Sequence, residues 1–145
     1  MQLTRYTDYS LRVLMYLAAM PGELTRIEDI SDAYGISRGH VMKVVRGLAN
    51  EGYVESLRGR GGGVKLARSA DDISLGEVVR ATEENLALVE CFGPGSSGHC
   101  VIEPACGLQG ALSAALDAFL ATLDAYTLGD LMTKRRAMTR LLEIA

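Results

Sequence analysis

The sequence predicts a mainly α-helical protein, a winged helix-turn-helix with a long C-terminal dimerisation helix, on three observations. Two short amphipathic segments flank a glycine-containing turn at residues 34–37. Two short β-type segments follow, joined by a glycine-rich turn. Apolar residues then recur in steps of three and four over residues 107–126. We expect a winged helix-turn-helix domain at 1–82, a cysteine-containing loop at 83–106, and a dimerisation helix with a C-terminal tail at 107–145.

The first expected element is a helix over residues 7–19. Leu11, Leu14 and Leu17 recur near helical spacing, and Pro21 with the glycine after it ends the segment. A second helix is expected over residues 27–34. Thr25 and Glu28 have the spacing of a capping box, in which each side chain binds the other residue's backbone N–H.

A third helix is expected to begin after Ser37 and to end at Asn50. The Ser37 hydroxyl can cap its first turn, Gly35 supplies the tight turn before it, and Gly52 can terminate it. Two helices joined in this way form the helix-turn-helix pattern, in which the second helix enters the major groove of DNA.

The segment after the third helix predicts a β-hairpin, or wing. Residues 53–56 and 64–66 have strand composition, and residues 58–63 between them are arginine and glycine only. Ser74 and Glu77 then form a second capping-box pattern, which opens a helix ending near Thr82.

Charge is distributed unevenly along the chain. The formal net charge is −3, but residues 1–68 carry a balance of +3 and residues 69–145 a balance of −6. Between residues 34 and 68, seven basic residues accompany two acidic ones. This basic third of the chain is a candidate phosphate-binding surface.

The basic side chains fall on the third helix and the hairpin tip. We expect Ser37 to lie at the leading turn of the helix, Arg38 and His40 to contact or approach bases, and Lys43 and Arg46 to contact phosphates. Arg58 or Arg60 suits insertion into a narrow A·T-rich minor groove. The alternative is that these residues form an ordinary solvated surface, which explains a single cation better than the whole set.

Three cysteines, Cys91, Cys100 and Cys106, lie in one segment, separated by eight and five residues. Their odd number and the absence of a recognisable export signal favour metal, cluster or redox chemistry in the cytoplasm over a disulfide framework. Thiolates suit iron–sulfur clusters, zinc or copper(I), and no Cys-x-x-Cys pair is present. His99, Glu103 or a residue of a partner chain could complete such a site. We find no constellation of nucleophile and base that indicates an enzyme.

The long helix expected over residues 107–126 presents an apolar stripe that includes Leu112, Leu116 and Phe119, with alanines that permit close backbone approach. A winged-helix domain is complete without this helix, so we favour a dimer interface. The alternative is a helix packed on its own domain.

Taken together, the chain resembles the iron–sulfur winged-helix regulators, and in particular the nitric-oxide-sensitive repressors among them. The resemblance covers residues 1–131. The stretches that carry it are MQLTRYTDYSLRVLMYLA, YGISRGHVMKVVRGLANEGYVESLRGRGGGVKL, CVIEPACGLQGAL and LDAYTLGDL.

This resemblance implies that Cys91, Cys100 and Cys106 bind a cluster, 4Fe–4S in type, with Asp8 of the other subunit as the fourth ligand. Family members with a 2Fe–2S cluster use a histidine where this chain has Gln109, which disfavours that type. Asp8 can instead pair with Arg12, four residues on in the same helix. The inserted run Gly-Pro-Gly-Ser-Ser-Gly makes the first cysteine spacing longer than is common in the family.

The implied mechanism is that a cluster-loaded homodimer represses transcription on a roughly palindromic, A·T-rich operator, and that nitric oxide dismantles the cluster and releases the DNA. Two rival hypotheses keep the fold. One is a thiol-redox or zinc-dependent regulator, with a Cys₃His site that includes His99. The other is an iron–sulfur carrier or oxidoreductase whose winged helix binds protein; such a protein would not need the cations on the helix and wing.

Overall fold

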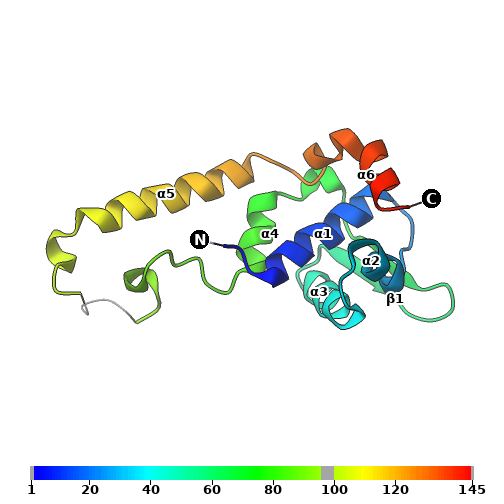
Figure 1. Ribbon diagram of the computed structural model, residues 1–145, viewed down its shortest axis with the longest axis horizontal. Coiled ribbons are helices and arrows are strands. Elements are labelled where there is room, and N and C mark those ends of the chain that lie inside the picture. The colour runs from blue at the N-terminus through cyan, green and yellow to red at the C-terminus, as the bar shows by residue number, and fades with distance from the viewer. Residues whose placement is uncertain (1, 96–99, 145) are drawn as a thin grey trace.

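The computed structural model describes residues 2–95 and 100–144 (Figure 1). The α-helices and strands are α1 (Arg5–Ala19), α2 (Ile27–Tyr34), α3 (Arg38–Asn50), β1 (Val54–Leu57), β2 (Gly63–Leu66), α4 (Leu75–Thr82), α5 (Gly107–Asp124) and α6 (Arg135–Leu141). Short 3₁₀ turns lie between them: η1 (Ala70–Asp72), η2 (Glu90–Phe92), η3 (Glu103–Ala105) and η4 (Asp130–Lys134). The predicted mainly α-helical winged helix-turn-helix is confirmed.

Helix α1 lies at the centre of the N-terminal domain. Val13, Leu14 and Leu17 are essentially inaccessible to solvent, and the helix contacts α3, α4, β2, η4 and α6. Its neighbours contribute buried valines, leucines and isoleucines to the same core, which extends as far as Leu128. The chain therefore forms one core around α1, and the last segment belongs to it.

The helix-turn-helix forms as predicted, apart from one cap. Ser37 caps α3, its hydroxyl oxygen accepting from the backbone N–H of His40, and Gly35 adopts a left-handed conformation with φ of +62°. The predicted capping box at Thr25 and Glu28 is wrong. Thr25 is buried and pairs with Val64 of the wing through two backbone hydrogen bonds of 2.9 and 2.8 Å. Arg26 stands at the start of α2 without a side-chain cap.

The wing is a two-stranded antiparallel hairpin of β1 and β2, in which Val54 pairs with Leu66 and Leu57 with Gly63. Val54 and Val64 are buried against the core, while the tip between the strands is exposed. A side chain at Gly62 would collide with the carbonyl oxygen of Leu57. Glycine is therefore required for the tight return of the chain.

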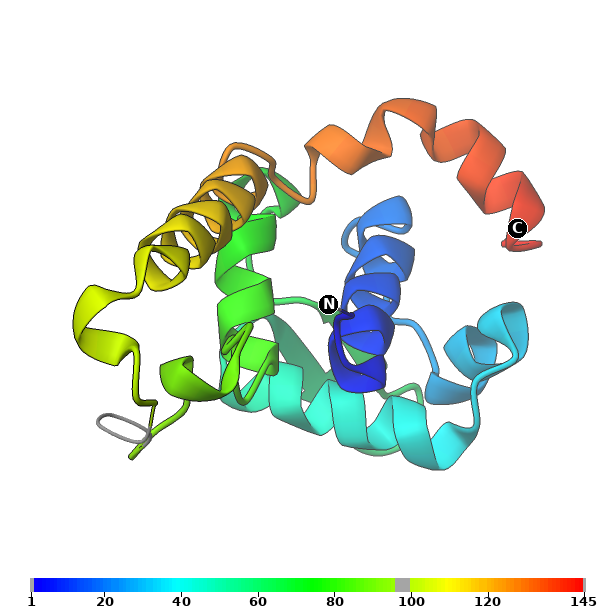
Figure 2. The same cartoon turned by 60° about the vertical axis from the view of Figure 1, so that its left-hand side comes forward.

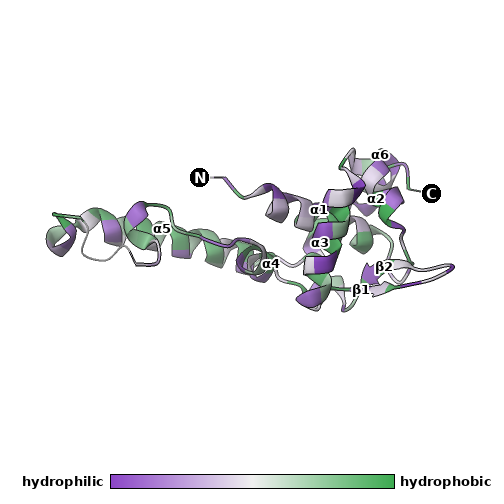
Figure 3. Cartoon of the chain, turned by 90° about the horizontal axis from the view of Figure 1, so that it is seen from below, coloured by the Kyte–Doolittle hydropathy of each residue, from purple (hydrophilic) through white to green (hydrophobic). Residues whose placement is uncertain are grey.

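Helix α5 projects away from the domain (Figures 1 and 2), with α4 between it and α1. In this chain, none of the described α5 residues is buried, although most of them are apolar (Figure 3). Its C-terminal end is joined to α4 by two hydrogen bonds, from Arg80 Nη1 and Nη2 to the Asp124 carboxylate at 2.6 and 2.7 Å. The helix ends two residues before the predicted Tyr126.

The C-terminal segment returns to the domain. Leu128 is fully buried, and the Arg135 guanidinium donates to the carbonyl oxygen of Ala19, the last residue of α1, at 2.7 Å. A cation is favourable at this end of a helix, where carbonyl groups lack partners.

Among the described helices, none is long and apolar enough to cross a bilayer.

The Arg80–Asp124 pair predicts a pH-dependent junction between α4 and α5. Hydrogen bonds from Arg80 hold the pKa of Asp124 below its ordinary value of 3.8. The pair therefore stabilises the protein at neutral pH, and this contribution is lost as the pH falls through the lowered pKa. In thermal unfolding, Asp124→Asn should melt below the wild type near neutral pH, and the difference should vanish in acid.

The control is Asp117→Asn, which removes an exposed carboxylate from the same helix that has no ion pair within the described chain. It should show no such pH-dependent offset. If the difference in melting temperature between Asp124→Asn and the wild type persisted unchanged in acid, the ion pair would not be what stabilises the contact between α4 and α5.

Candidate DNA interface and cysteine segment

Helix α3 buries one side and exposes the other. Val41, Val44 and Leu48 point into the core. The side chains predicted to meet DNA are all exposed: Ser37, Arg38, His40, Lys43 and Arg46. The helical repeat thus separates a packing face from a solvent face that carries four basic or ionisable side chains.

His40 is held by contacts from two elements. Its Nδ1 lies 2.9 Å from the hydroxyl oxygen of Ser37, and its ring lies 5.9 Å, centroid to centroid, from the ring of Tyr9 on α1. Tyr9 is half-buried and follows Asp8 directly. No local sequence signal marks Tyr9, because its contact with His40 joins residues 31 positions apart.

Arg38 forms an ion pair with Glu28 of α2, with 3.5 Å between Nη1 and Oε1. Both side chains are exposed, so the pair is weak and can open. Glu28 was expected to cap its own helix, but here its carboxylate pairs with Arg38 instead.

Lys43 and Arg46 border an open hollow of about 750 Å³ between α3, the start of α1 and the segment after α4. Neither forms an ion pair with a described residue.

In the same hollow the Tyr6 hydroxyl lies so close to Gly47 that a Cβ there would collide with it. Burial, and secondarily the charge of Glu51, raises the pKa of Tyr6. Glycine at position 47 thus lets α1 pack closely on α3.

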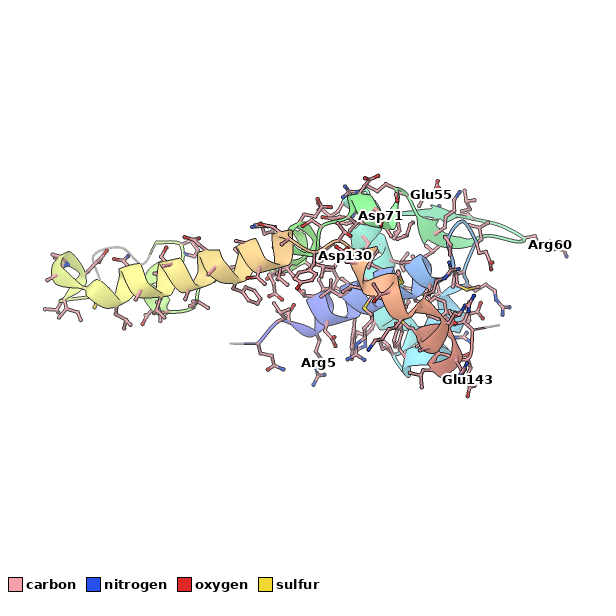
Figure 4. All side chains as sticks on the ribbon, turned by 90° about the horizontal axis from the view of Figure 1, so that it is seen from above. Arg5, Glu55, Arg60, Asp71, Asp130 and Glu143 are labelled. Carbon is pink, nitrogen blue, oxygen red and sulfur yellow. The ribbon has the colours of Figure 1, made fainter. Side chains whose placement is uncertain are left out.

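The wing carries Arg58 and Arg60, both exposed. Figure 4 shows Arg60 at the outermost tip of the hairpin, pointing away from the domain. Neither arginine pairs with an acidic group among the described residues. Both guanidinium groups are therefore available to an external anion.

The cysteines lie in the segment that contains η2 and η3 and leads into α5. Cys91 belongs to η2 and is half-buried, Cys100 is exposed, and Cys106 stands immediately before α5. All three are free thiols. Within the described residues, no three histidine, cysteine or acidic side chains converge on a metal position. The candidate ligand His99 lies outside the described residues, and Glu103 lies in η3.

The donor set nevertheless fits an iron–sulfur cluster in its chemistry. None of the three thiols lies within an α-helix or a β-strand, and none is fully buried. Thiolate sulfur is the ligand such clusters require, and three cysteines leave one position for another group.

Asp8 lies in the first turn of α1 and is paired within its own helix. The Arg12 guanidinium meets both carboxylate oxygens at 3.0 Å, and both side chains are nearly half exposed. Arg12 also approaches the ring of Tyr34, 6.0 Å from its centroid. Burial raises the pKa of the Tyr34 phenol, and the Arg12 charge opposes that shift. Asp8 can be reached by another chain once the pair opens.

These features define a winged-helix DNA-binding protein. Helix α3 has the basic, solvent-facing side of a recognition helix, the wing carries arginine at its tip, and both pack on α1 through one core. A family model described as "Rrf2: Iron-dependent Transcriptional regulator" matches residues 3–134. The chain therefore belongs to the Rrf2 family of transcriptional regulators, whose role is regulatory and not enzymatic.

Curated relatives match over the full length. The chain is 52% identical over 145 residues to the HTH-type transcriptional regulator NsrR of Bacillus subtilis, covering 99% of each chain. It is 51% identical over 144 residues to NsrR of Geobacillus kaustophilus, covering 99% of this chain and 97% of that one. These matches confirm the resemblance to this group of regulators that the sequence motifs indicated.

Solved structures confirm the fold. CymR (YrzC), titled the global cysteine regulator of B. subtilis, superposes with a TM-score of 0.75 at 27% identity, covering 92% of this chain and 98% of that one. IscR of T. potens gives a TM-score of 0.74 at 21% identity, covering 92% and 88%. At that identity the IscR likeness concerns the fold alone.

The exposed, unpaired cations predict a salt-sensitive interaction with DNA. Arg46→Gln should weaken binding to a random-sequence duplex and to a selected site by the same factor. It should also reduce the slope of log affinity against log salt concentration by about 1, since one phosphate contact is lost. Fluorescence anisotropy titrations at several salt concentrations measure both quantities.

The control is Arg140→Gln, which removes the same charge from the exposed surface of α6. It should leave the slope unchanged. Equal slopes for Arg46→Gln and the wild type would contradict the phosphate contact.

Proposed function

We propose that this chain is a homodimeric, iron–sulfur-dependent transcription repressor that releases its operator in response to nitric oxide. The observation that carries the proposal is the gathering of all three cysteines, as free thiols, in the segment that leads into an uncovered apolar helix. Similarity over the full chain to the NsrR regulators supports the same conclusion.

Homodimerisation would cover α5. Leu112, Leu116 and Phe119 are half-buried on an 18-residue helix that has no fully buried residue, and Leu116 and Phe119 border a hollow shared with the segment after α4 of the same chain. A second copy would cover the apolar surface that remains exposed, which is worth about 25 cal/mol per Å². The alanines between these three residues permit close approach of a second copy. Antiparallel or crossed pairing of two such helices buries both stripes and gives the two-fold symmetry usual for soluble oligomers.

The dimer would bind a roughly palindromic, A·T-rich operator. A two-fold axis places two recognition helices on equivalent half-sites, one helical turn of DNA or a multiple apart. Arg38 and His40 would approach base edges, Ser37 would fix the start of the helix, and Lys43 and Arg46 would hold phosphates. Arg58 or Arg60 of each wing would enter a minor groove, where narrow A·T-rich segments concentrate negative potential.

The cysteines would hold the cofactor. Cys91, Cys100 and Cys106 would bind a 4Fe–4S cluster, with Asp8 of the second copy at the remaining position. A 2Fe–2S cluster suits this chain less well, because Gln109 stands where a histidine would be needed. When bound, the cluster would supply iron that reacts with nitric oxide.

The chain's own part in the response would run through α1. When Asp8 is not a ligand it pairs with Arg12, as in the chain described here. The exchange between these two partners would alter the first turns of α1, which pack on α3 at Tyr6 and Gly47. Because the contact between α1 and α3 is tight, a shift of α1 would displace the recognition helix. The distance between the two recognition helices of the dimer would then no longer match the two half-sites.

A second candidate is a thiol-redox or zinc-dependent regulator that uses the same cysteines. Cys100 is exposed and Cys91 and Cys106 are half-buried, so all three thiols have some access to solvent. Accessible thiols can also form disulfides or bind zinc, which supports this second candidate. Iron and zinc content separates the two candidates.

The dimer interface predicts the effect of one charge on α5. Leu116→Lys should produce a monomer in sedimentation velocity and weaken operator binding, since a buried ammonium lacks a partner. Asp117→Asn, which makes the same change in charge on an exposed neighbouring position, should remain dimeric. A dimeric Leu116→Lys protein would place the interface elsewhere.

The cluster predicts the behaviour of Cys100→Ala. Under anaerobic conditions, wild-type protein should lose DNA binding on addition of nitric oxide, and Cys100→Ala should show no nitric-oxide-dependent change. The control is Val101→Ala, an almost fully exposed neighbour in the same loop, which should respond as the wild type does. A Cys100→Ala dimer that still responded normally would overturn the proposal.

A further inference from the structure

The His40 side chain stands on the solvent face of α3, yet it is not free to rotate. An exposed histidine ordinarily samples several rotamers. Here Ser37 lies against one ring nitrogen and Tyr9 lies against the ring. The two supports come from different elements, the start of α3 and the body of α1, so they fix the ring from two directions.

The Ser37 hydroxyl carries out two tasks at once. As the cap of α3, its oxygen accepts from the backbone N–H of His40, at 3.4 Å. The same oxygen lies 2.9 Å from Nδ1 of that residue. A hydroxyl has one hydrogen to donate, and donation to Nδ1 satisfies it while the oxygen continues to cap the helix.

The roles in this contact depend on the tautomer: Ser37 donates to Nδ1 when the ring hydrogen is on Nε2, and accepts from Nδ1–H in the other neutral tautomer. In a neutral histidine, the hydrogen bond made by one ring nitrogen sets the tautomer of the other. With Nδ1 accepting from Ser37, the hydrogen resides on Nε2. If the ring is charged, Nε2 carries a hydrogen as well, and Nδ1 donates to the Ser37 oxygen instead.

Tyr9 of α1 is the second neighbour of the imidazole ring. Tyr9 is half-buried, and its ring is tilted by 53° to the imidazole, with 5.9 Å between the ring centroids. Because Tyr9 belongs to the buried helix α1, it is less mobile than a surface side chain. The contact therefore limits rotation of His40 before DNA is bound, and a pre-positioned donor loses less entropy on binding.

We propose that Ser37 and Tyr9 are positioning residues that present Nε2–H of His40 as a fixed hydrogen-bond donor to a base edge in the major groove. The groups it can recognise are acceptors: N7 of a purine, O6 of guanine or O4 of thymine. The amino groups of cytosine and of adenine are donors and are excluded. This assignment rests on the proposed DNA-binding function and adds to it the chemistry of one base contact.

The test is selection of bound duplexes from a random-sequence library by the purified full-length dimer, followed by sequencing. Wild-type protein should show a preference at two symmetry-related positions for a base that offers an acceptor. His40→Ala should flatten that preference by about tenfold, with other positions unchanged. Tyr9→Leu should flatten the same positions, and Tyr9→Phe, which keeps the ring, should restore them.

Tyr126→Leu is the matched control, since it removes an exposed tyrosine outside the helix-turn-helix. It should leave every preference intact. Thermal unfolding of each variant shows that loss of preference does not come from loss of fold. Where the preferred base is a purine, its 7-deaza analogue should lower wild-type affinity and leave the affinity of His40→Ala unchanged.

Three outcomes would overturn the assignment. A wild-type protein with no sequence preference at all would contradict the proposed operator-binding function itself. A preference lost in His40→Ala but kept in Tyr9→Leu would show that Tyr9 does not position the ring. A His40-dependent preference for cytosine would show that Nε2 acts as an acceptor, opposite to the tautomer inferred here.

Discussion

The burial of α1 is the constraint on which the other elements of this protein depend. Val13 and Leu14 have no exposed surface, and α3, α4, the wing and the C-terminal segment all pack on the helix that carries them. Its first turns touch the recognition helix through Tyr6 and Tyr9, and its last carbonyl accepts from Arg135. A close-packed interior transmits displacement instead of absorbing it. Whatever acts on Asp8 therefore acts close to the DNA-reading surface.

The second constraint is an apolar helix with no core of its own. Helix α5 is attached to the domain at its C-terminal end by Arg80 and Asp124, and Cys106 stands at its other end. A second copy laid along α5 would cover the stripe and bring the cysteine segment of one chain near the N-terminal domain of the other. Dimerisation and cluster binding are thus linked in the proposed mechanism through the same helix.

Local signals predicted most of the fold. The bounds of α2 and α3, the Ser37 cap and the glycine-rich hairpin each follow from residues adjacent in sequence, and the structure confirms them. Helix α1 begins two residues before the predicted start, and α5 ends two residues before the predicted end. Ser74 caps α4 as predicted, but Glu77 pairs with Arg68 and does not complete the capping box. The capping box at Thr25 was wrong because its backbone pairs with Val64, a contact between residues far apart in the chain. The contacts of Tyr9 with His40 and of Glu28 with Arg38 were beyond prediction for the same reason.

The cysteine segment sets a different limit. Its composition predicts the class of ligand, because sulfur donors restrict the choice of metal, but in the proposed dimer its geometry would also depend on a second copy of the chain. Side chains that converge on a metal do so fully only when it is bound, since binding energy offsets the cost of ordering the loop.

The most direct test of the account is an anaerobic absorption spectrum of the freshly purified protein, with iron and sulfide analysis, before and after addition of nitric oxide. The account predicts broad visible absorption from iron–sulfur charge transfer, about four irons and four sulfides per chain, and bleaching by nitric oxide. A colourless protein that contains zinc, or no metal after attempted cluster reconstitution, would contradict it.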